Sequence, residues 1–237
     1  MRAQTRHQLK QDRFAEAVMH QVDWAAEHRK KLIVSGVVAA IVLAVAAGAW
    51  YANGQRDLTA SAKLGDAVRV YESQIVAPGT PATPGQQTFT SAADRAKAAQ
   101  ALFADIADHY GSTSSGRIAR YFLGLTYKDI GNIPAAESAL KKVAGSRDKD
   151  LGAMAKYALG GLYMAQKRNN DAVNIYKDLA EHPTTSISKN TAQLDLAELY
   201  ESIQQPQQAR ALYEQIRKDD PKSSAAQYAQ ARLSSLK

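Results

Sequence analysis

The sequence predicts an all-α protein in which a single transmembrane helix is followed by a solenoid of helix-turn-helix hairpins. Two observations predict this fold: residues 32–51 form an uninterrupted uncharged run, and one residue pattern recurs three times after it. The composition agrees, because alanine, leucine, glutamine, lysine and arginine favour helix, whereas aromatic residues make up only 7% of the chain. One elongated domain with an anchor suits 237 residues.

The net charge of +7 raises the question of a nucleic-acid partner, since clustered Lys and Arg neutralise phosphates. The basic residues do not form one stripe. Some gather in the first 31 positions, and the others alternate with Asp and Glu as on solvated helix faces. No recognition motif accompanies them, so no nucleic-acid partner is expected. The absence of cysteine excludes disulfides, thiolate catalysis and cysteine metal sites.

The uncharged run at 32–51 has the length of a transmembrane helix. At ~1.5 Å per residue it covers ~30 Å, the thickness of the hydrocarbon layer. The basic residues 29–31 precede it, and Trp50 and Tyr51 end it where an interfacial aromatic belt would lie. This bias predicts a cytoplasmic N-terminus and a C-terminal domain on the opposite side. The alternatives are the reversed orientation and a signal peptide cleaved near residues 47–49.

Residues 1–31 are predicted to form a cytoplasmic amphipathic stub, because Phe14, Val18, Val22 and Ala25 follow helical spacing. The pattern does not decide whether the stub rests on the membrane, continues the span or docks on a partner. Within the span, small residues recur every four positions, which would let another helix approach closely, unless they only reflect an Ala-rich composition. This candidate transmembrane packing face consists of Gly36, Ala40, Ala44 and Gly48.

After the span, the same residue types return three times at identical internal spacing, which is typical of a repeat architecture. A plain Ala-rich helical bundle is the alternative. Each copy has a Leu followed by a small residue, then a Tyr, an Ala and a large residue: Leu123-Gly124, Tyr127, Ala136 and Leu140; Leu159-Gly160, Tyr163, Ala172 and Tyr176; Leu196-Ala197, Tyr200, Ala209 and Tyr213.

This spacing resembles the tetratricopeptide repeat, in which two helices form a hairpin and hairpins stack. The small residue of the first helix is expected to meet the Ala of the second helix where the two cross, and the Tyr to fill the space between hairpins. Gly131-Asn132 and Asn169-Asn170 are expected to break two hairpins, and Pro134 and Pro206 to open second helices. The resulting domains are a degenerate first hairpin at 52–116 with a Pro/Gly-rich insertion at 76–92, three repeats at 117–222, and a capping helix at 223–237.

No catalytic chemistry is expected. The sequence has no Walker loop, dinucleotide-binding glycine motif, metalloprotease motif or nucleophile elbow. His109 and His182 are predicted near helix ends, where the helix dipole favours a cation, and this structural role is preferred to metal binding. We therefore expect a protein that is not an enzyme, has no cofactor or metal, and takes no small-molecule substrate.

Solenoids of this kind bind peptides in a concave groove lined by their first helices. In the carboxylate-clamp version, Lys, Asn and Arg occupy set groove positions, but here Tyr121 with Leu125, and Tyr157 with Gly161, stand there. An apolar surface of Tyr and Met suits partly unfolded or hydrophobic segments better than an acidic C-terminus. Each candidate could instead only pack between helices. The groove candidates are Tyr121, Lys128, Tyr157, Met164, Leu194, Glu198 and Glu201.

The order of segments resembles the YfgM-like family of bacterial ancillary SecYEG translocon subunits, whose domain is grouped with that of the cell-division coordinator CpoB. The basic stub, the stretch DWAAEHRKK that leads into the span, and a repeat domain with a degenerate first hairpin carry this resemblance. It implies an inner-membrane protein with a periplasmic C-terminal domain that binds translocon subunits, a periplasmic chaperone or nascent secreted chains. The alternatives are a scaffold for cell division or envelope synthesis, and a regulatory subunit of a membrane complex.

Overall fold

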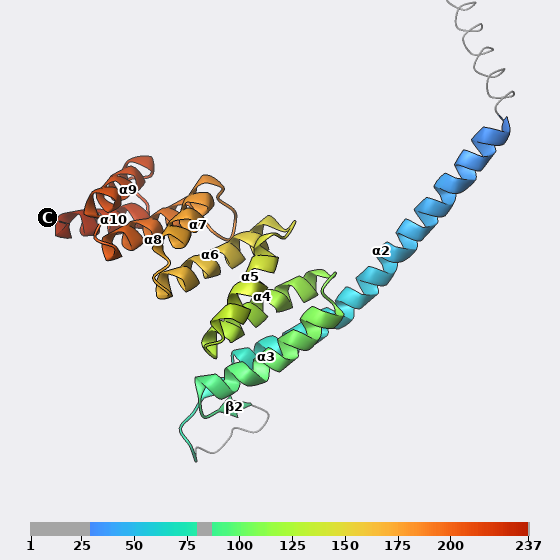
Figure 1. Ribbon diagram of the computed structural model, residues 1–237, viewed down its shortest axis with the longest axis horizontal. Coiled ribbons are helices and arrows are strands. Elements are labelled where there is room, and N and C mark those ends of the chain that lie inside the picture. Colours follow the sequence, from blue (N-terminus) through green and yellow to red (C-terminus); the bar gives the residue numbers. More distant parts are fainter. Residues whose placement is uncertain (1–28, 80–86, 237) are drawn as a thin grey trace, which may run out of the picture. The chain divides into compact units, whose positions relative to one another are not determined.

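The computed structural model of the protein describes residues 29–79 and 87–236 (Figure 1). Within these ranges the chain forms nine α-helices and one pair of two-residue strands. The all-helical solenoid predicted from the repeats is therefore confirmed. The amphipathic pattern predicted for Phe14, Val18, Val22 and Ala25 lies outside the described residues, as does the middle of the Pro/Gly-rich insertion.

Helix α2, Arg29–Tyr71, contains the apolar run and continues without a break beyond it. The chain divides inside this helix into two compact units, one ending at Gly54 and the other beginning at Gln55. In the first unit the described side chains from residue 37 onward are exposed, and Trp50 reaches 80% exposure. The part Val37–Tyr71 is long and apolar enough to cross a membrane, with a mean hydropathy of 1.7 in its best stretch.

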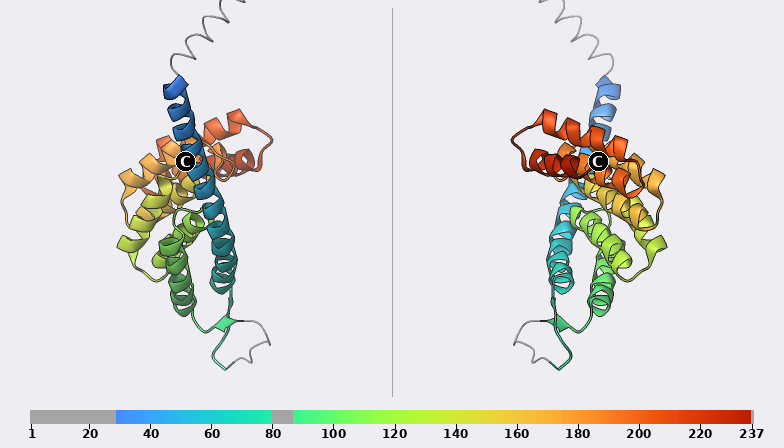
Figure 2. Two further views of the ribbon diagram at one scale, coloured as in Figure 1. Left: turned by 90° about the vertical axis from the view of Figure 1, so that its right-hand side faces the viewer. Right: turned by 90° about the vertical axis from the view of Figure 1, so that its left-hand side faces the viewer.

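The second unit begins with a hairpin made by the end of α2 and helix α3, Ala92–His109, which run side by side in both views (Figures 1 and 2). The Arg56 guanidinium donates to the His109 carbonyl at 2.7 Å, and the Lys63 ammonium lies 2.9 Å from the Asp105 carboxylate. These contacts join the N-terminal end of one helix segment to the C-terminal end of the other.

The sequence predicts an irregular connection between these two helices, but part of this connection forms strands. Strand β1, Gln74–Ile75, pairs in parallel with β2, Thr88–Phe89, so the two ends of the insertion are held together. Parallel strands need a connection of about a dozen residues, and the Pro/Gly-rich insertion provides one.

Three more hairpins and a final helix follow, each packed on its neighbours in chain order. First helices also contact one another, since α4 touches α6 and α8 touches α10. Side-chain oxygens of Ser, Thr, Asn or Asp cap the N-termini of α4, α5, α6, α8 and α10. The bounds are α4 Ser114–Asp129, α5 Ile133–Ala144, α6 Lys149–Ala165, α7 Asn169–Glu181, α8 Lys189–Ser202, α9 Pro206–Asp219 and α10 Ser224–Ser235.

Two hydrophobic clusters form the core of this unit. The smaller one joins α2, α3 and α4 and contains a group of rings in which Phe103 stacks on Phe122 at 5.2 Å while Tyr71 meets both edge-on. The larger one runs from α5 to α10. Tyr127 of α4 packs against both clusters, which confirms that this repeat position lies between hairpins.

The small residues of the repeat allow close helix crossings, and the nearest atoms belong to the large residue of the second helix. A Cβ on Gly124 would lie 2.7 Å from the Leu140 side chain, and one on Gly160 would lie 2.8 Å from the Tyr176 ring. The residue that fills the space is thus the large one of the second helix. Ala136, the repeat Ala expected to meet the glycine, is fully buried.

Each hairpin turn places one residue in the left-handed region at the same repeat offset: Gly131 at φ 79°, Lys167 at 58° and Gln204 at 60°. In the first turn, the amide of residue 131 donates to the carbonyl of residue 128 at 3.0 Å, and that of residue 132 donates to the Tyr127 carbonyl at 2.8 Å. The other two turns repeat both bonds, which define a Schellman motif. The turn predicted at Asn169-Asn170 therefore lies earlier, because both residues belong to α7.

Candidate binding surface

The predicted groove residues all lie on first helices: Tyr121 and Lys128 on α4, Tyr157 and Met164 on α6, and Leu194, Glu198 and Glu201 on α8. We call these seven residues the first-helix face. None of them is buried, and the four apolar or aromatic members also pack against the larger core. These four side chains therefore serve the core and still present a surface to solvent.

On α4, the Tyr121 ring meets Phe122 edge-on at 5.5 Å, and burial raises the pKa of its hydroxyl. Lys128 is exposed, and its ammonium lies 3.9 Å from the Asp129 carboxylate. Asp129 in turn accepts a hydrogen bond from the Tyr71 hydroxyl at 3.0 Å. On α4 the face therefore consists of one aromatic side chain and one lysine whose charge is offset by Asp129.

On α6, the Tyr157 ring meets Tyr176 of α7 edge-on at 5.9 Å, and burial raises the pKa of Tyr157 to about 12. Met164 lies two turns further along the same side of the helix and is half-buried. Between them Gly161 is exposed, and a Cβ there would meet no atom within 4 Å. This helix therefore offers an open apolar strip.

On α8 the face becomes acidic, and its two glutamates differ in their partners. Glu201 accepts from the Tyr213 hydroxyl at 2.6 Å and forms an ion pair with Arg232 of α10. Glu198 is exposed and accepts a hydrogen bond from the Tyr228 hydroxyl at 2.6 Å. The charge of Glu201 is thus balanced within the solenoid.

Sequence reasoning missed Asp195, which belongs to the same part of the surface. Its Oδ2 atom is buried and has no hydrogen-bond partner among the described residues. Burial raises the pKa of Asp195, and the negative charge of Glu198 raises it further. A hydrogen bond donated by the Tyr157 hydroxyl of α6 acts in the opposite direction. The predicted residues on α8 follow helical spacing from Leu194, and Asp195 stands one position outside that spacing. Only its contact with Tyr157 of α6 shows that it belongs to this surface.

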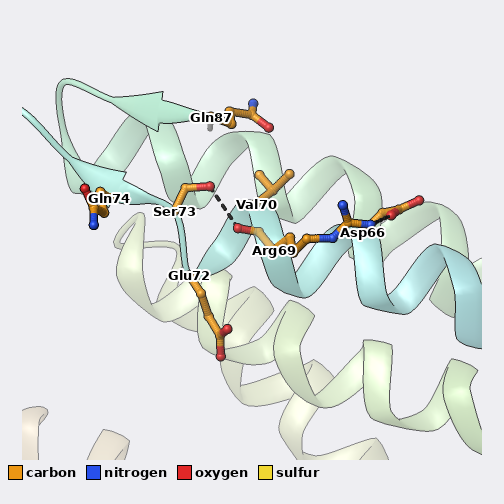
Figure 3. Close-up of a pocket in the computed structure, with 7 residues that line it drawn as sticks. All are labelled: Asp66, Arg69, Val70, Glu72, Ser73, Gln74 and Gln87. Carbon is orange, nitrogen blue, oxygen red and sulfur yellow. Dashed lines mark hydrogen bonds and ion pairs between the residues drawn. The ribbon is translucent and has the colours of Figure 1, made fainter. Parts of the chain in front are cut away.

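Several cavities lie elsewhere in the described part of the second unit, including one of about 440 Å³ lined by residues 167–171. Another, of about 590 Å³, lies at the end of α2 beside the strand pair, where Arg69 pairs with Asp66 and the Ser73 hydroxyl donates to the Arg69 carbonyl at 2.8 Å (Figure 3). Two others, of about 400 and 650 Å³, lie between α6 and α7 and along α7, α8 and α9. They are open and lined by mixed side chains, with no cluster of reactive groups.

His109 and His182 lie at helix ends, as the sequence predicted. His109 ends α3 and His182 caps the C-terminus of α7, and their Nδ1 atoms lie 2.9 and 3.1 Å from the carbonyls of Asp105 and Asp178. Among residues 29–79 and 87–236, no three His, Asp or Glu side chains gather in a way that could hold a metal ion. Of the transmembrane candidates, Ala40, Ala44 and Gly48 are exposed, and Gly36 lies in the same helix.

Comparisons with known proteins bear on the repeats. The model of the tetratricopeptide repeat family matches residues 163–233, from the end of α6 to α10. A solved structure of nearly identical TPR-like repeats, assigned to a kinesin light chain of Podospora anserina, is 20% identical, covers 60% of this chain and 77% of its own, and superposes with a TM-score of 0.47. No curated protein matches the chain.

The matched family is not a catalytic one, and repeats of this type are typical of protein-interaction scaffolds. The matched segment begins at the repeat tyrosine of α6, Tyr163, and includes the whole third copy. Residues 163–233 therefore match the tetratricopeptide repeat, within a second unit that is a tetratricopeptide-like helical solenoid.

Proposed function

We propose that the protein is a non-catalytic scaffold, held in a bacterial inner membrane by residues 32–51, whose solenoid binds protein partners in the periplasm through the first-helix face. The observation that carries this proposal is the strip of half-buried apolar side chains on α6, Tyr157 and Met164, with the open position at Gly161 between them. Partly exposed aromatic and Met side chains on rigid helices are typical of peptide-binding surfaces.

The anchor is supported by the exposed apolar side chains of α2, which include Leu43 at 70% and Trp50 at 80% exposure. A continuous apolar surface of this kind is unfavourable in water, and a bilayer removes that cost. The basic residues 29–31 support a cytoplasmic N-terminus. The small-residue positions 36, 40, 44 and 48 would then be available to a neighbouring transmembrane helix.

The partners that we propose are translocon subunits, a periplasmic chaperone and nascent secreted chains. The segment order and the DWAAEHRKK junction support this choice through their resemblance to ancillary translocon subunits. A cell-division or envelope-synthesis scaffold and a regulatory subunit of a membrane complex stay as alternatives.

Topology can be tested cleanly because the chain contains no cysteine. Two variants, Gln4→Cys and Gln208→Cys, would be exposed in intact cells to a membrane-impermeant maleimide that crosses only the outer membrane. We expect labelling of position 208, which is exposed on α9, and of position 4 only after lysis. Labelling of position 4 in intact cells, or extraction of the protein by carbonate, would contradict the proposed anchor and orientation.

The partners can be tested by photo-crosslinking with benzoyl-phenylalanine at Tyr157 and Met164, with Lys177 on the second helix α7 as the matched exposed control. We expect adducts with translocon or chaperone subunits from the two face positions only. Adducts with division proteins alone would favour that alternative, and equal adducts from all three positions would refute binding through the first-helix face. Deleting residues 1–28 should leave the adducts unchanged, because an adaptor that acts in the periplasm does not need a cytoplasmic output.

A further inference from the structure

We propose that the part of the first-helix face between α6 and α8 binds a peptide segment that carries an apolar residue and, a few positions before or after it, a Lys or Arg. This inference rests on the proposed peptide-binding function and assigns the chemistry of its ligand. It adds Asp195 to the binding residues and separates the roles of the two helices: α6 takes the apolar side chain and α8 takes the cation.

The first step is that α8 carries negative charge without a counter-ion. Among the described residues, neither Asp195 nor Glu198 forms an ion pair, whereas the neighbouring Glu201 is neutralised by Arg232. The Asp195 Oδ2 atom is shielded from water and unpartnered. A buried carboxylate oxygen without a donor is unfavourable, and a guanidinium or ammonium group that reached it would supply the missing hydrogen bond.

The second step is that the groups around Asp195 offer it no cation. The Tyr157 hydroxyl of α6 and the carboxylate of Glu198 are the side chains that influence its pKa besides burial. On α10, Tyr228 donates to Glu198, and Arg232 is engaged with Glu201 and Tyr213. The surface therefore has an acidic spot with a phenol ring at its edge, and rings of this kind also attract cations.

The third step is the apolar neighbour. Tyr157 and Met164 line α6, and the missing side chain at Gly161 leaves room between them for an entering side chain. Leu194 extends this apolar surface to α8. The Tyr157 hydroxyl of α6 reaches Asp195 of α8, so the apolar strip adjoins the acidic spot. An extended peptide advances about 3.3 Å per residue, so an apolar and a basic residue about three positions apart would span roughly 10 Å.

This arrangement also explains why the face carries a carboxylate that does not help the fold. An unpaired, half-buried acid destabilises the folded state, and natural proteins retain such groups where binding requires them. Replacing Asp195 by Asn should therefore raise stability while it weakens binding, whereas a purely structural residue would lose stability on substitution.

The test uses the full chain in nanodiscs of zwitterionic phosphatidylcholine, so that basic peptides do not bind the lipid. The probe is an array of 12-residue peptides with Leu at one central position and Arg, Lys, Gln or Glu three residues earlier or three residues later. The variants are Asp195→Asn with Glu198→Gln, and a control with the same charge change at exposed positions, Asp108→Asn with Glu214→Gln.

We expect the protein and the control to prefer Arg and Lys over Gln by about tenfold, which corresponds to about 1.4 kcal/mol. This preference should shrink as salt is added. It should vanish in the Asp195 and Glu198 variant, whose melting temperature should not fall, and Glu198→Lys should shift the preference towards the Glu peptide. Peptide binding without a charge preference, or a preference that survives the double substitution, would refute this inference but leave the peptide-binding face intact. Failure of all peptides to bind would contradict the proposed function as well.

Discussion

Lys167 and Gln204 occupy left-handed backbone positions that the first hairpin fills with Gly131. For a residue with a side chain, this conformation costs roughly 1–2 kcal/mol, and glycine avoids the cost. Glycine also makes the unfolded chain more flexible, which reduces this gain in stability by about 0.4–1 kcal/mol. Lys167→Gly and Gln204→Gly should therefore each stabilise the second unit by about 0.5–1 kcal/mol, and Gly131→Ala should destabilise it by about 1 kcal/mol.

For a unit of this size, 1 kcal/mol shifts the melting temperature by about 2–4 °C, so each glycine should raise it by about 1–4 °C. The two gains should add, because the turns belong to different hairpins. Circular dichroism at 222 nm on the full chain in nanodiscs measures the shift. The matched control is Lys177→Gly in the exposed middle of α7, which should cost about 1 kcal/mol. If Lys167→Gly lowers the melting temperature as much as this control does, the turn stores no strain and the reasoning is wrong.

Three further predictions concern packing and pH. Gly160→Ala should lower the stability by about 1–3 kcal/mol, because its Cβ would lie 2.8 Å from the buried Tyr176 ring. Gly161→Ala should raise the stability by up to about 1 kcal/mol, because its Cβ would meet no atom within 4 Å. Denaturant titration of both variants measures the two changes. Lys141 and Arg168 hold the pKa of Glu137 below its usual 4.5. The ionised carboxylate therefore stabilises the fold above pH 4.5, and this stabilisation is lost as the pH falls through the lower pKa of the folded state. Glu137→Gln should remove this loss of stability at acid pH, which thermal melts from pH 2 to 6 would measure. Burial raises the pKa of Asp195, so stability falls as the pH rises from 3.8 through the folded value; Asp195→Asn should be more stable at pH 7 by up to about 1 kcal/mol, and a lower melting temperature there would contradict the unpaired-charge argument.

The sequence allowed the hairpins to be placed because a fixed spacing of Leu, small residue and Tyr has few structural solutions. It predicted the turn at Gly131, since glycine at the end of a helix is a direct signal of left-handed backbone. It did not reveal the equivalent turns at Lys167 and Gln204, because those residue types carry no such preference. Only the alignment of the three copies at one offset makes these positions comparable, and the backbone hydrogen bonds then identify them.

The candidate surface shows the same limit. Helical spacing selects side chains that share one side of a helix, such as Tyr157 and Met164, because that information is local. Whether Glu201 is free or paired depends on Arg232, which is 31 residues away in the chain. Asp195 belongs to the surface through Tyr157, on a different hairpin. Contacts between successive hairpins set the charge balance of the surface, and a single sequence does not specify them.

The two hydrophobic clusters, which share the helix α4 and the ring of Tyr127, have a consequence for how the molecule comes apart. In a linear array of hairpins, cooperative unfolding stops at a weak interface between two neighbouring hairpins. The hairpin of α2 and α3 could open while the helices from α5 to α10 keep their order, so that amide hydrogens of α3 would exchange faster than those of α8. A stack built in this way loses its structure in steps.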